Sequence, residues 1–512
     1  MAPSAHTETE RKYDLKVGDD LPRLDDIPGV VEVSKPHKER LDAIYFDTAD
    51  FRLARHGATL RRRAGGADAG WHLKVPVGGD SRVELRVPLN GVTNAPPDEL
   101  ADLATALVRG APLRPVVLMK TKRISRQLVG KKGRPVAEVT DDTVTARYLG
   151  DESTVDKWRE VEVELAGRAD AKVLDGAERV LRKAGVRRSA RGSKLERVIG
   201  ISRDQQKSLR AKASAGESVL AYVRAQYDAL VDNDLQARQG TEDAVHQMRV
   251  AARRMRSVLR VFGKIVDEER TTALRDNLQW LGQRLAAARS LEVQHARFRE
   301  IIEELPAELV LGPVGQRLTR HFGPAEADAR RTVLKTLNGK RYRRLLNEID
   351  QLLTDPPLTK KAKRRASDEL PKHVAKAHRK TKRRLRDAKA LPAGEQRDVA
   401  LHSARKAAKR YRYATECAES VVGKPAGKTR QRVKDLTQVL GDHQDGAEAL
   451  PVLRDLGVRA HLAGVNAFTF GIMHERENAR RLRAERLVPT YWRRVKAKLP
   501  TKWPSFRGKS SG

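Results

Sequence analysis

The chain has 512 residues and a single cysteine, Cys417, which excludes an intramolecular disulfide framework and cysteine-rich zinc sites. Its 103 lysine and arginine residues outnumber 67 aspartate and glutamate residues, and the resulting net charge of +36 favours polyanionic partners. No signal-peptide pattern and no apolar run of about 20 residues appears, so we expect a cytoplasmic protein of two to four domains without membrane insertion.

The first 200 residues consist of short segments in which apolar and polar side chains alternate, separated by glycine, proline, aspartate and asparagine. An alternation of period two is typical of strands with one buried face. The segments predicted as strands are 7–15, 58–64, 70–77, 81–89, 135–142 and 158–167. Helices are expected at 98–109 and 170–184, so this part is predicted to be an α+β domain with an antiparallel sheet.

The polar faces of these strands are sorted by charge. The groups that share a face are Glu8, Glu10 and Lys12; Arg61 and Arg63; His72 and Lys74; Arg82, Glu84 and Arg86; and Glu160, Glu162 and Glu164. A sheet that faces solvent on one side would mix neutral polar side chains into these positions. We therefore predict a closed barrel whose charged face points inward and whose apolar outer face is covered by helices. Unpaired charges inside the barrel are costly unless a multiply charged ligand and divalent cations compensate them.

These residues resemble the CYTH domains, which are triphosphate tunnel metalloenzymes. Glu8-x-Glu10-x-Lys12 matches the E-x-E-x-K signature of that family. The other matching segments are YFDT at 45–48, Arg61-x-Arg63, WHLK ending at Lys74, TKR ending at Arg123, AEVTDD near 136–142, Glu160-x-Glu162-x-Glu164 and Ser193-Lys194. The resemblance covers about residues 5–200, and the ordered set of segments makes it specific.

The resemblance implies hydrolysis of a terminal phosphoanhydride, in which a metal and arginines neutralise developing charge while water attacks in line. Carboxylates without cysteine ligands select a hard cation, Mg²⁺ or Mn²⁺. The implied metal ligands are Glu8, Glu10, Glu162 and Glu164. The implied catalytic residues are Glu160, as a ligand or water-orienting base, and Lys12. The implied phosphate-binding residues are Lys12, Arg61, Arg63, Lys74, Arg123 and Lys194, and Asp141 is expected to orient one of these arginines.

The positive charge is concentrated after residue 200. Residues 1–200 have a net charge of +6 and residues 201–512 a net charge of +30. Residues 201–215 are charged and rich in alanine and serine without an apolar stripe, which is typical of a linker. We expect domains at 1–200 and 216–500, joined by this linker and followed by a flexible tail at 501–512.

A basic segment occurs twice in the second half, as VHQMRVAARRMR at 245–256 and LHSARKAAKRYR at 401–412, with a constant offset of 156 residues. Spacings of three, seven and ten residues place the basic side chains on one stripe of a helix. The two stripes are His246, Arg249, Arg253 and Arg256, and His402, Arg405, Lys409 and Arg412. Related segments follow at 281–293 and 436–448. We predict an all-α domain, a duplicated helical bundle with repeats at about 216–350 and 366–500, whose stripes face each other across a groove.

This half resembles a CHAD domain, a duplicated helical module that commonly follows CYTH and is associated with inorganic polyphosphate. The resemblance implies that the eight stripe residues bind polyphosphate. Ser290 stands where the family usually has an aspartate, whereas the second repeat keeps Asp442 and Asp445. A contribution of that aspartate is therefore in doubt for the first repeat alone.

The segment GKPAGKT at 423–429 imitates a phosphate-binding P-loop. Three residues separate its glycines where that loop needs four, and no buried strand precedes it. We interpret it as a loop between helices.

The sequence thus predicts a metal-dependent phosphohydrolase, an inorganic triphosphatase acting on triphosphate or short polyphosphate, tethered to a polyphosphate-binding domain. One alternative is a non-enzymatic polyphosphate-binding or granule-associated protein with an inactive tunnel. Another is a hydrolase of organic triphosphates, such as thiamine triphosphate or nucleoside triphosphates. Nucleic-acid binding by the second half also fits its charge.

Overall fold

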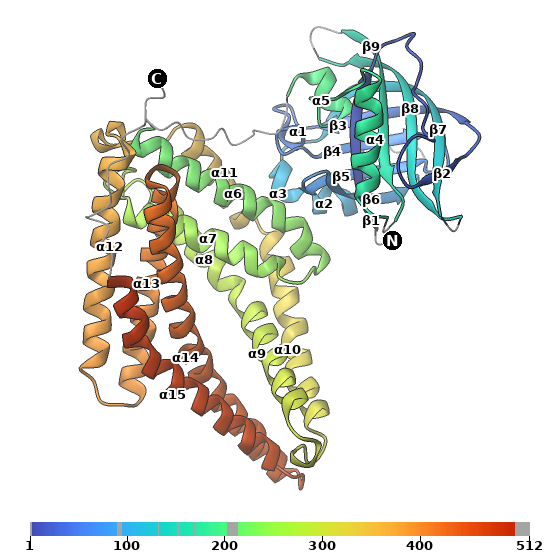
Figure 1. Cartoon of the computed structure of the whole chain (residues 1–512). Helices are drawn as coiled ribbons and strands as arrows, with labels where there is room; N and C mark the ends of the chain where they lie inside the picture. The colour runs from blue at the N-terminus through green and yellow to red at the C-terminus, as the bar shows by residue number, and fades with distance from the viewer. Residues whose placement is uncertain are drawn as a thin grey trace. The chain divides into compact units, whose positions relative to one another are not determined.

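The computed structural model describes residues 3–89, 95–131, 133–150, 154–167, 169–201 and 213–496. It divides into two compact units, Met1–Gln205 and Gln206–Gly512 (Figure 1). Most of the predicted linker and all of the predicted tail lie outside the described residues. None of the described helices combines the length and the apolar character that crossing a bilayer requires.

The first unit is a closed antiparallel barrel of eight strands in the order β1-β6-β5-β4-β3-β7-β8-β9, and β9 pairs with β1 to complete the ring. The strands are β1 (Ser4–Leu15), β3 (His37–Asp47), β4 (Thr59–Ala64), β5 (Gly70–Gly78), β6 (Ser81–Pro88), β7 (Arg114–Gly130), β8 (Pro135–Tyr148) and β9 (Val155–Leu165). Two short strands, β2 (Val30–Val33) and β10 (Arg187–Arg188), add to β7 and β1. The predicted closed antiparallel barrel is confirmed.

Alternation along the strands decides which side chains face inward. On β9 Glu162 and Glu164 line the interior, while Val161 and Val163 are completely buried on the outer face. There they pack with Leu174 and Leu181 of helix α4 (Lys172–Lys183) in a hydrophobic cluster. A second outer cluster contains Leu195 of α5 (Lys194–Ile199). The helices therefore cover apolar outer surface, as the charge sorting predicts.

Two long strands, β3 and β7, are absent from the strands that alternation predicts. The first half of β3 is largely exposed and polar, and β7 carries basic residues over much of its length. β3 pairs with β7 and β7 pairs with β8 along most of their length. These polar segments are therefore strands because of hydrogen bonds to neighbouring strands and not because of their own alternation. Near the predicted helix at 98–109 the structure has two short helices, α2 (Asp98–Leu103) and α3 (Thr105–Val108), and a short helix α1 (Arg52–Arg55) follows β3.

The second unit is all-helical in its described part, which confirms the predicted fold class (Figure 1). Its helices are α6 (Ala215–Gln239), α7 (Ala244–Val261), α8 (Thr272–Arg284), α9 (Ala286–Glu304), α10 (Val314–Leu337), α11 (Lys340–Thr354), α12 (Ala366–Lys389), α13 (Glu395–Val422), α14 (Lys424–Leu462) and α15 (Phe468–Lys496), with 3-10 turns at Ala307–Leu309 and Lys360–Lys363. The repeat is visible in the element order: α7 corresponds to α13, α8 with α9 to the long α14, and α10 to α15.

The P-loop imitation at 423–429 is not a loop, so that interpretation was wrong. Gly423 has a positive φ of 71° and separates α13 from α14, which begins at Lys424. Pro425 lies in the first helical turn, where its missing N–H costs nothing. A single glycine is enough to connect the two helices because it adopts a conformation that other residues avoid.

A buried ion pair joins the two repeats. Arg297 of α9 donates to Glu477 of α15 in a two-pronged contact, with Nε 2.9 Å from Oε1. Both side chains are buried, and they lie beside a hydrophobic cluster that contains Phe298, Phe322 and Phe470. Removing one partner leaves an uncompensated charge in this interior.

We expect Arg297→Ala to destabilise the helical unit by about 3 kcal/mol or more, because Glu477 would remain buried without its partner. Differential scanning calorimetry of the full chain measures the change. Arg299→Ala is the matched control, since Arg299 on the same helix forms an exposed pair with Glu303 and should cost at most about 1 kcal/mol. Equal losses for the two variants would contradict the assignment.

Candidate functional site

The barrel encloses a cavity of about 240 Å³. Eight lysine and arginine side chains and seven carboxylates line it in the described part of the chain. The predicted site residues among them are Glu8, Glu10, Lys12, Arg61, Arg63, Lys74, Arg123, Glu162, Glu164 and Lys194. Glu160 is the predicted site residue of the barrel that does not line this cavity. Closure of the sheet thus gathers residues that are up to 186 positions apart in the sequence.

Three glutamates converge at the pairing of β1 with β9. Glu10 lies directly opposite Glu164 in the register, and Glu8 is two residues further along β1. Carboxylate oxygens of the three side chains lie within 4.8 Å of one another. Burial and the neighbouring Glu8 raise the pKa of Glu164 to about 7. Crowded carboxylate oxygens fit a hard divalent cation, which would relieve their repulsion.

Glu162 occupies a cationic part of the cavity instead. Lys12 donates to it, Nζ of Lys194 lies 2.7 Å away and Nη2 of Arg123 lies 3.5 Å away. Burial acts to raise the pKa of Glu162, but these three cations together hold it well below its ordinary value. The side chain is therefore ionised and fully engaged by cations. Glu8 and Glu10 have cationic partners too, Lys74 at 2.5 Å and Lys12 at 3.1 Å.

Glu160 lies beyond the cavity and holds Lys194. Its Oε1 is 2.7 Å from Nζ of Lys194, and its Oε2 accepts a hydrogen bond of 2.5 Å from the indole N–H of Trp158. The carboxylate is buried, so both contacts are protected from water. This geometry makes Glu160 a positioning residue for a lysine that lines the cavity.

Arg123 is fixed by Asp142, not by Asp141 as expected. Nε and Nη2 of Arg123 lie 2.8 and 2.7 Å from the two carboxylate oxygens of Asp142, its direct neighbour across β7 and β8. Asp141 makes the same two-pronged contact with Arg159. Adjacent residues of a strand point to opposite faces, so the expectation was wrong by one position.

Arg61 and Arg63 project from β4 into the same cavity. Asp68 forms an ion pair with Arg63, while Nη1 of Arg61 lies 3.4 Å from the hydroxyl of Tyr45. Burial and the charges of Arg61 and Arg123 lower the pKa of Arg63 to about 9. Three arginines that repel one another in an enclosed space favour an anion between them.

Glu84 is a central side chain that the sequence analysis did not select. It is completely buried, its Oε1 lies 2.9 Å from Nδ1 of His72, and it forms ion pairs with Lys74, Arg61 and Arg86. The sequence feature that could have identified Glu84 is its place between Arg82 and Arg86 on the polar face of β6. Sequence alone did not indicate that one carboxylate would anchor several cavity-lining cations.

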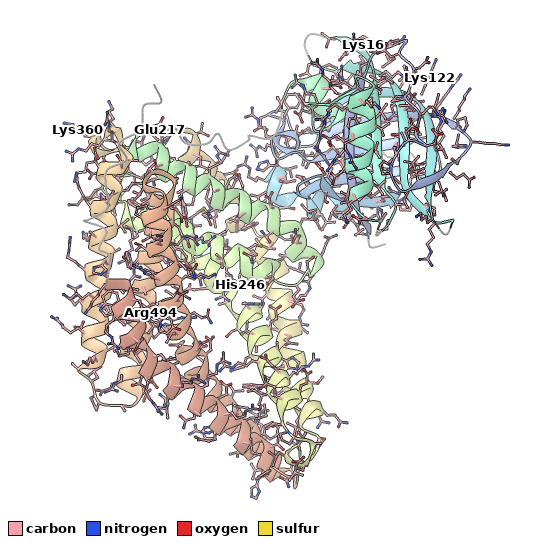
Figure 2. All side chains as sticks on the ribbon, viewed as in Figure 1. Lys16, Lys122, Glu217, His246, Lys360 and Arg494 are labelled. Atoms are coloured by element: carbon pink, nitrogen blue, oxygen red, sulfur yellow. The ribbon has the colours of Figure 1, made fainter. Side chains whose placement is uncertain are left out.

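In the helical unit, a cavity of about 700 Å³ lies between the two repeats. The stripe residues that line it are His246, Arg249 and Arg253 of α7 and His402, Arg405 and Lys409 of α13. Figure 2 labels His246 on the helical unit. Arg256 and Arg412 are not among the lining residues. Arg412 forms an ion pair with Glu416 and stacks on Tyr413 at 4.8 Å. The predicted groove therefore contains the first three residues of each stripe.

The groove is cationic, although Arg289, Arg297 and Arg405 of its lining have acidic partners. Burial and the charges of Arg253, Arg405 and Arg412 lower the pKa of Lys409 to about 6, while Asp445 opposes this shift. Burial and nearby arginines also lower the pKa of His246 to about 4. Such mutual repulsion stabilises a bound polyanion relative to the empty groove.

Ser290 and Asp445 both line the groove, from α9 and α14 respectively. Asp445 lies 3.9 Å from Arg405, whereas Ser290 brings no charge. The first repeat thus presents its basic stripe with less acidic compensation than the second repeat does.

A second group that could hold a metal lies on α13, α14 and α15: Asp398, His443 and Glu485 have ligand atoms within 4.8 Å of one another. Both carboxylates already have arginine partners, Arg481 at 3.1 Å from Asp398 and Arg397 at 2.7 Å from Glu485. The group is thus held together by ion pairs within the helical unit.

Two solved structures are similar to part of this chain. PptA from Streptomyces chartreusis is 22% identical, with a TM-score of 0.46 over 55% of this chain and 100% of that chain. The CHAD domain from the plant Ricinus communis is 22% identical, with a TM-score of 0.43 over 59% of this chain and 96% of that chain.

Relatives from Mycobacterium tuberculosis match over nearly the whole length. Uncharacterized protein Rv2226 of strain H37Rv and uncharacterized protein MT2285 of strain CDC 1551 are each 36% identical over 492 residues, 93% of either chain. The CYTH domain family matches residues 6–199, and the CHAD domain family matches residues 221–454. The chain therefore belongs to the proteins in which a CYTH domain is followed by a CHAD domain.

Proposed function

We propose that the barrel is a metal-dependent phosphohydrolase that acts on inorganic triphosphate or short polyphosphate. The observation that carries this proposal is the cavity in which three converging carboxylates adjoin a set of buried lysines and arginines. Membership of the CYTH domain family supports it. A volume of 240 Å³ lies below the roughly 300–1,000 Å³ of pockets that enclose drug-sized ligands, which favours a compact inorganic substrate.

The charge balance of the cavity supports a metal that accompanies the substrate. Eight cationic side chains nearly balance seven carboxylates, so a triphosphate adds several negative charges that the side chains alone do not neutralise. Glu8, Glu10 and Glu164 would hold Mg²⁺ or Mn²⁺. Such an ion neutralises charge on the transferring phosphoryl group when it is bound.

The protein's own side chains divide into fixed and exchangeable phosphate ligands. Arg123 is held by Asp142 in a two-pronged contact and presents its remaining N–H groups to the cavity. Lys12 and Lys194 contact Glu162 and would transfer these contacts to phosphate oxygens when substrate enters. Glu160 keeps Lys194 in place during this exchange.

For the helical unit we propose that the groove binds inorganic polyphosphate. Six basic or imidazole side chains of the stripes line it, and its lysine and arginine charges repel one another. A bound chain would raise the effective concentration of phosphate ends at the tethered barrel. A binding role in the cytoplasm, for example at polyphosphate granules, is the second candidate function, because the groove needs no active barrel to hold a polyanion.

Glu10→Gln should lower metal-dependent phosphate release from tripolyphosphate by about 100-fold or more, because it removes one of three converging carboxylates. The assay uses the purified full chain with Mg²⁺ or Mn²⁺, and EDTA should abolish the activity. Glu32→Gln on β2 is the control, since Glu32 is exposed and outside the cavity.

Unchanged turnover in Glu10→Gln would show that the carboxylate cluster is not the metal site. Absence of turnover in the wild type on tripolyphosphate, ATP, thiamine triphosphate and long polyphosphate, with polyphosphate still bound, would favour the binding-protein candidate. Turnover of ATP or thiamine triphosphate alone would instead identify an organic triphosphatase.

Polyphosphate affinity should increase as the pH falls from about 8 towards the Lys409 pKa of about 6. A bound polyanion favours the protonated form of Lys409. Above pH 6 Lys409 of the empty groove is mostly neutral, so binding takes up a proton and becomes stronger as the pH falls. Lys409→Arg keeps its charge throughout this range, so its polyphosphate affinity should depend less on pH. Protonation of the polyphosphate itself affects both proteins equally and does not explain a difference between them. Isothermal titration calorimetry at several pH values measures it, and identical slopes would contradict the role of Lys409.

A further inference from the structure

One difference in charge between the two repeats lies just beyond their basic stripes. Glu416 on α13 corresponds to Arg260 on α7 through the same offset of 156 residues that relates His402 to His246. Both helices continue without interruption to these residues, so the correspondence holds in space as well as in sequence. A carboxylate in one repeat is thus an arginine in the other.

On the side of Glu416 the positive charge is compensated. Nε of Arg254 and Nε of Arg412 each lie 3.4 Å from its carboxylate, and the hydroxyl of Tyr222 donates a hydrogen bond of 2.9 Å. The carboxylate is only 14% exposed, so these contacts are largely shielded from solvent. One buried acid therefore ends the cationic stripe on this side.

On the other side the equivalent positions contain only arginines. Arg254 and Arg412 correspond to Arg410 and Arg256, and Arg260 replaces the acid. Burial and the charges of Arg260 and Arg256 lower the pKa of Arg410.

Two residues of α12 enlarge this basic cluster. Burial and the charges of Arg410, Arg260 and Arg384 lower the pKa of Lys380. The charge of Arg384 also lowers the pKa of Arg410. Among the described residues, none of these five basic side chains has an acid within ion-pair distance, whereas Glu416 pairs with two arginines on the other side. Asp276 acts on Arg256 alone, opposing the shift of its pKa.

The cluster is continuous with the groove. Arg253 lines the groove, and its charge acts on Arg256, the next residue of the same stripe. From His246 to Arg260 the helix advances about 21 Å. The cationic surface of α7 therefore runs from the groove past its end, whereas that of α13 stops at Glu416.

We propose that Arg256, Arg260, Arg410, Lys380 and Arg384 form a second phosphate-binding site, which holds the part of a long polyphosphate chain that leaves the groove on this side. This inference rests on the proposed function of the groove. It adds the side on which a long chain leaves the groove and a preference for long chains. Short polyphosphate would occupy only the groove, whereas long polyphosphate would reach both sites.

The test reproduces in α7 the acid that α13 carries. Arg260→Glu should weaken binding of long-chain polyphosphate to the full chain by about tenfold and lower the salt dependence of binding by about one to two released ions. Binding of tripolyphosphate, the proposed substrate of the barrel, should stay unchanged and is the internal control. Arg384→Glu on α12 is a second variant with the same expectation. Arg260 and Arg384 are exposed, so neither change disturbs the core. Arg344→Glu, at an exposed site on α11, controls for the change in net charge.

Equal losses for Arg260→Glu and Arg344→Glu would overturn the second site. A parallel double variant of the groove, Arg249→Ala with Arg405→Ala, separates the two proposals. If it weakens binding of long-chain polyphosphate while Arg260→Glu and Arg384→Glu do not, the groove stands and the second site is wrong. If it leaves binding of long-chain polyphosphate unchanged, the groove proposal itself fails. An equal loss of affinity for single-stranded DNA in Arg260→Glu would overturn the assignment to polyphosphate.

Discussion

The pairing of β1 with β9 is the interaction on which the barrel site depends. It closes the sheet, and its register sets Glu10 opposite Glu164 and Lys12 opposite Glu162. The same few residues thus create a carboxylate cluster and, two positions further on, a lysine–glutamate contact. An open sheet would leave these charges in water, where their mutual effects are small. Inside the closed barrel these interactions are strong: the pKa of Glu164 is raised to about 7, and the pKa of Glu162 is held well below its ordinary value.

The sequence led us to expect that the charges inside the barrel need a ligand to compensate them. The structure shows that they compensate one another to a large extent. The lysines and arginines contact glutamates and aspartates of the barrel itself, as Lys74 does with Glu8 at 2.5 Å. In the proposed function, phosphate oxygens would replace these carboxylates as partners of the lysines and arginines. Asp142 and Glu160 would stay in place, because they hold Arg123 and Lys194.

The helical unit reaches a cationic site by a different route, through duplication. Two related helices place their stripes on one groove, where acidic partners are fewer than in the barrel: Asp445 lies 3.9 Å from Arg405 and Glu416 lies 3.4 Å from Arg412. Duplication also makes later changes visible, because each residue has a counterpart that serves as a reference. Ser290 against Asp445 and Arg260 against Glu416 both reduce acidic character in the first repeat. The two halves of the groove therefore differ in charge although they share a fold.

The sequence by itself determined the closed barrel, the all-helical second domain and most cavity-lining residues, because alternation and the 156-residue repeat are local patterns that survive without knowledge of contacts. It did not determine the partners. Of the four glutamates expected to hold a metal, Glu164 converges with Glu8 and Glu10 whereas Glu162 contacts lysines; Asp142 rather than Asp141 holds Arg123, and Glu160 lies outside the cavity. Nor did it reveal β3 and β7, whose polar segments become strands through their neighbours. These features depend on register between strands up to about 150 residues apart, and a shift of one residue would turn every side chain to the opposite face.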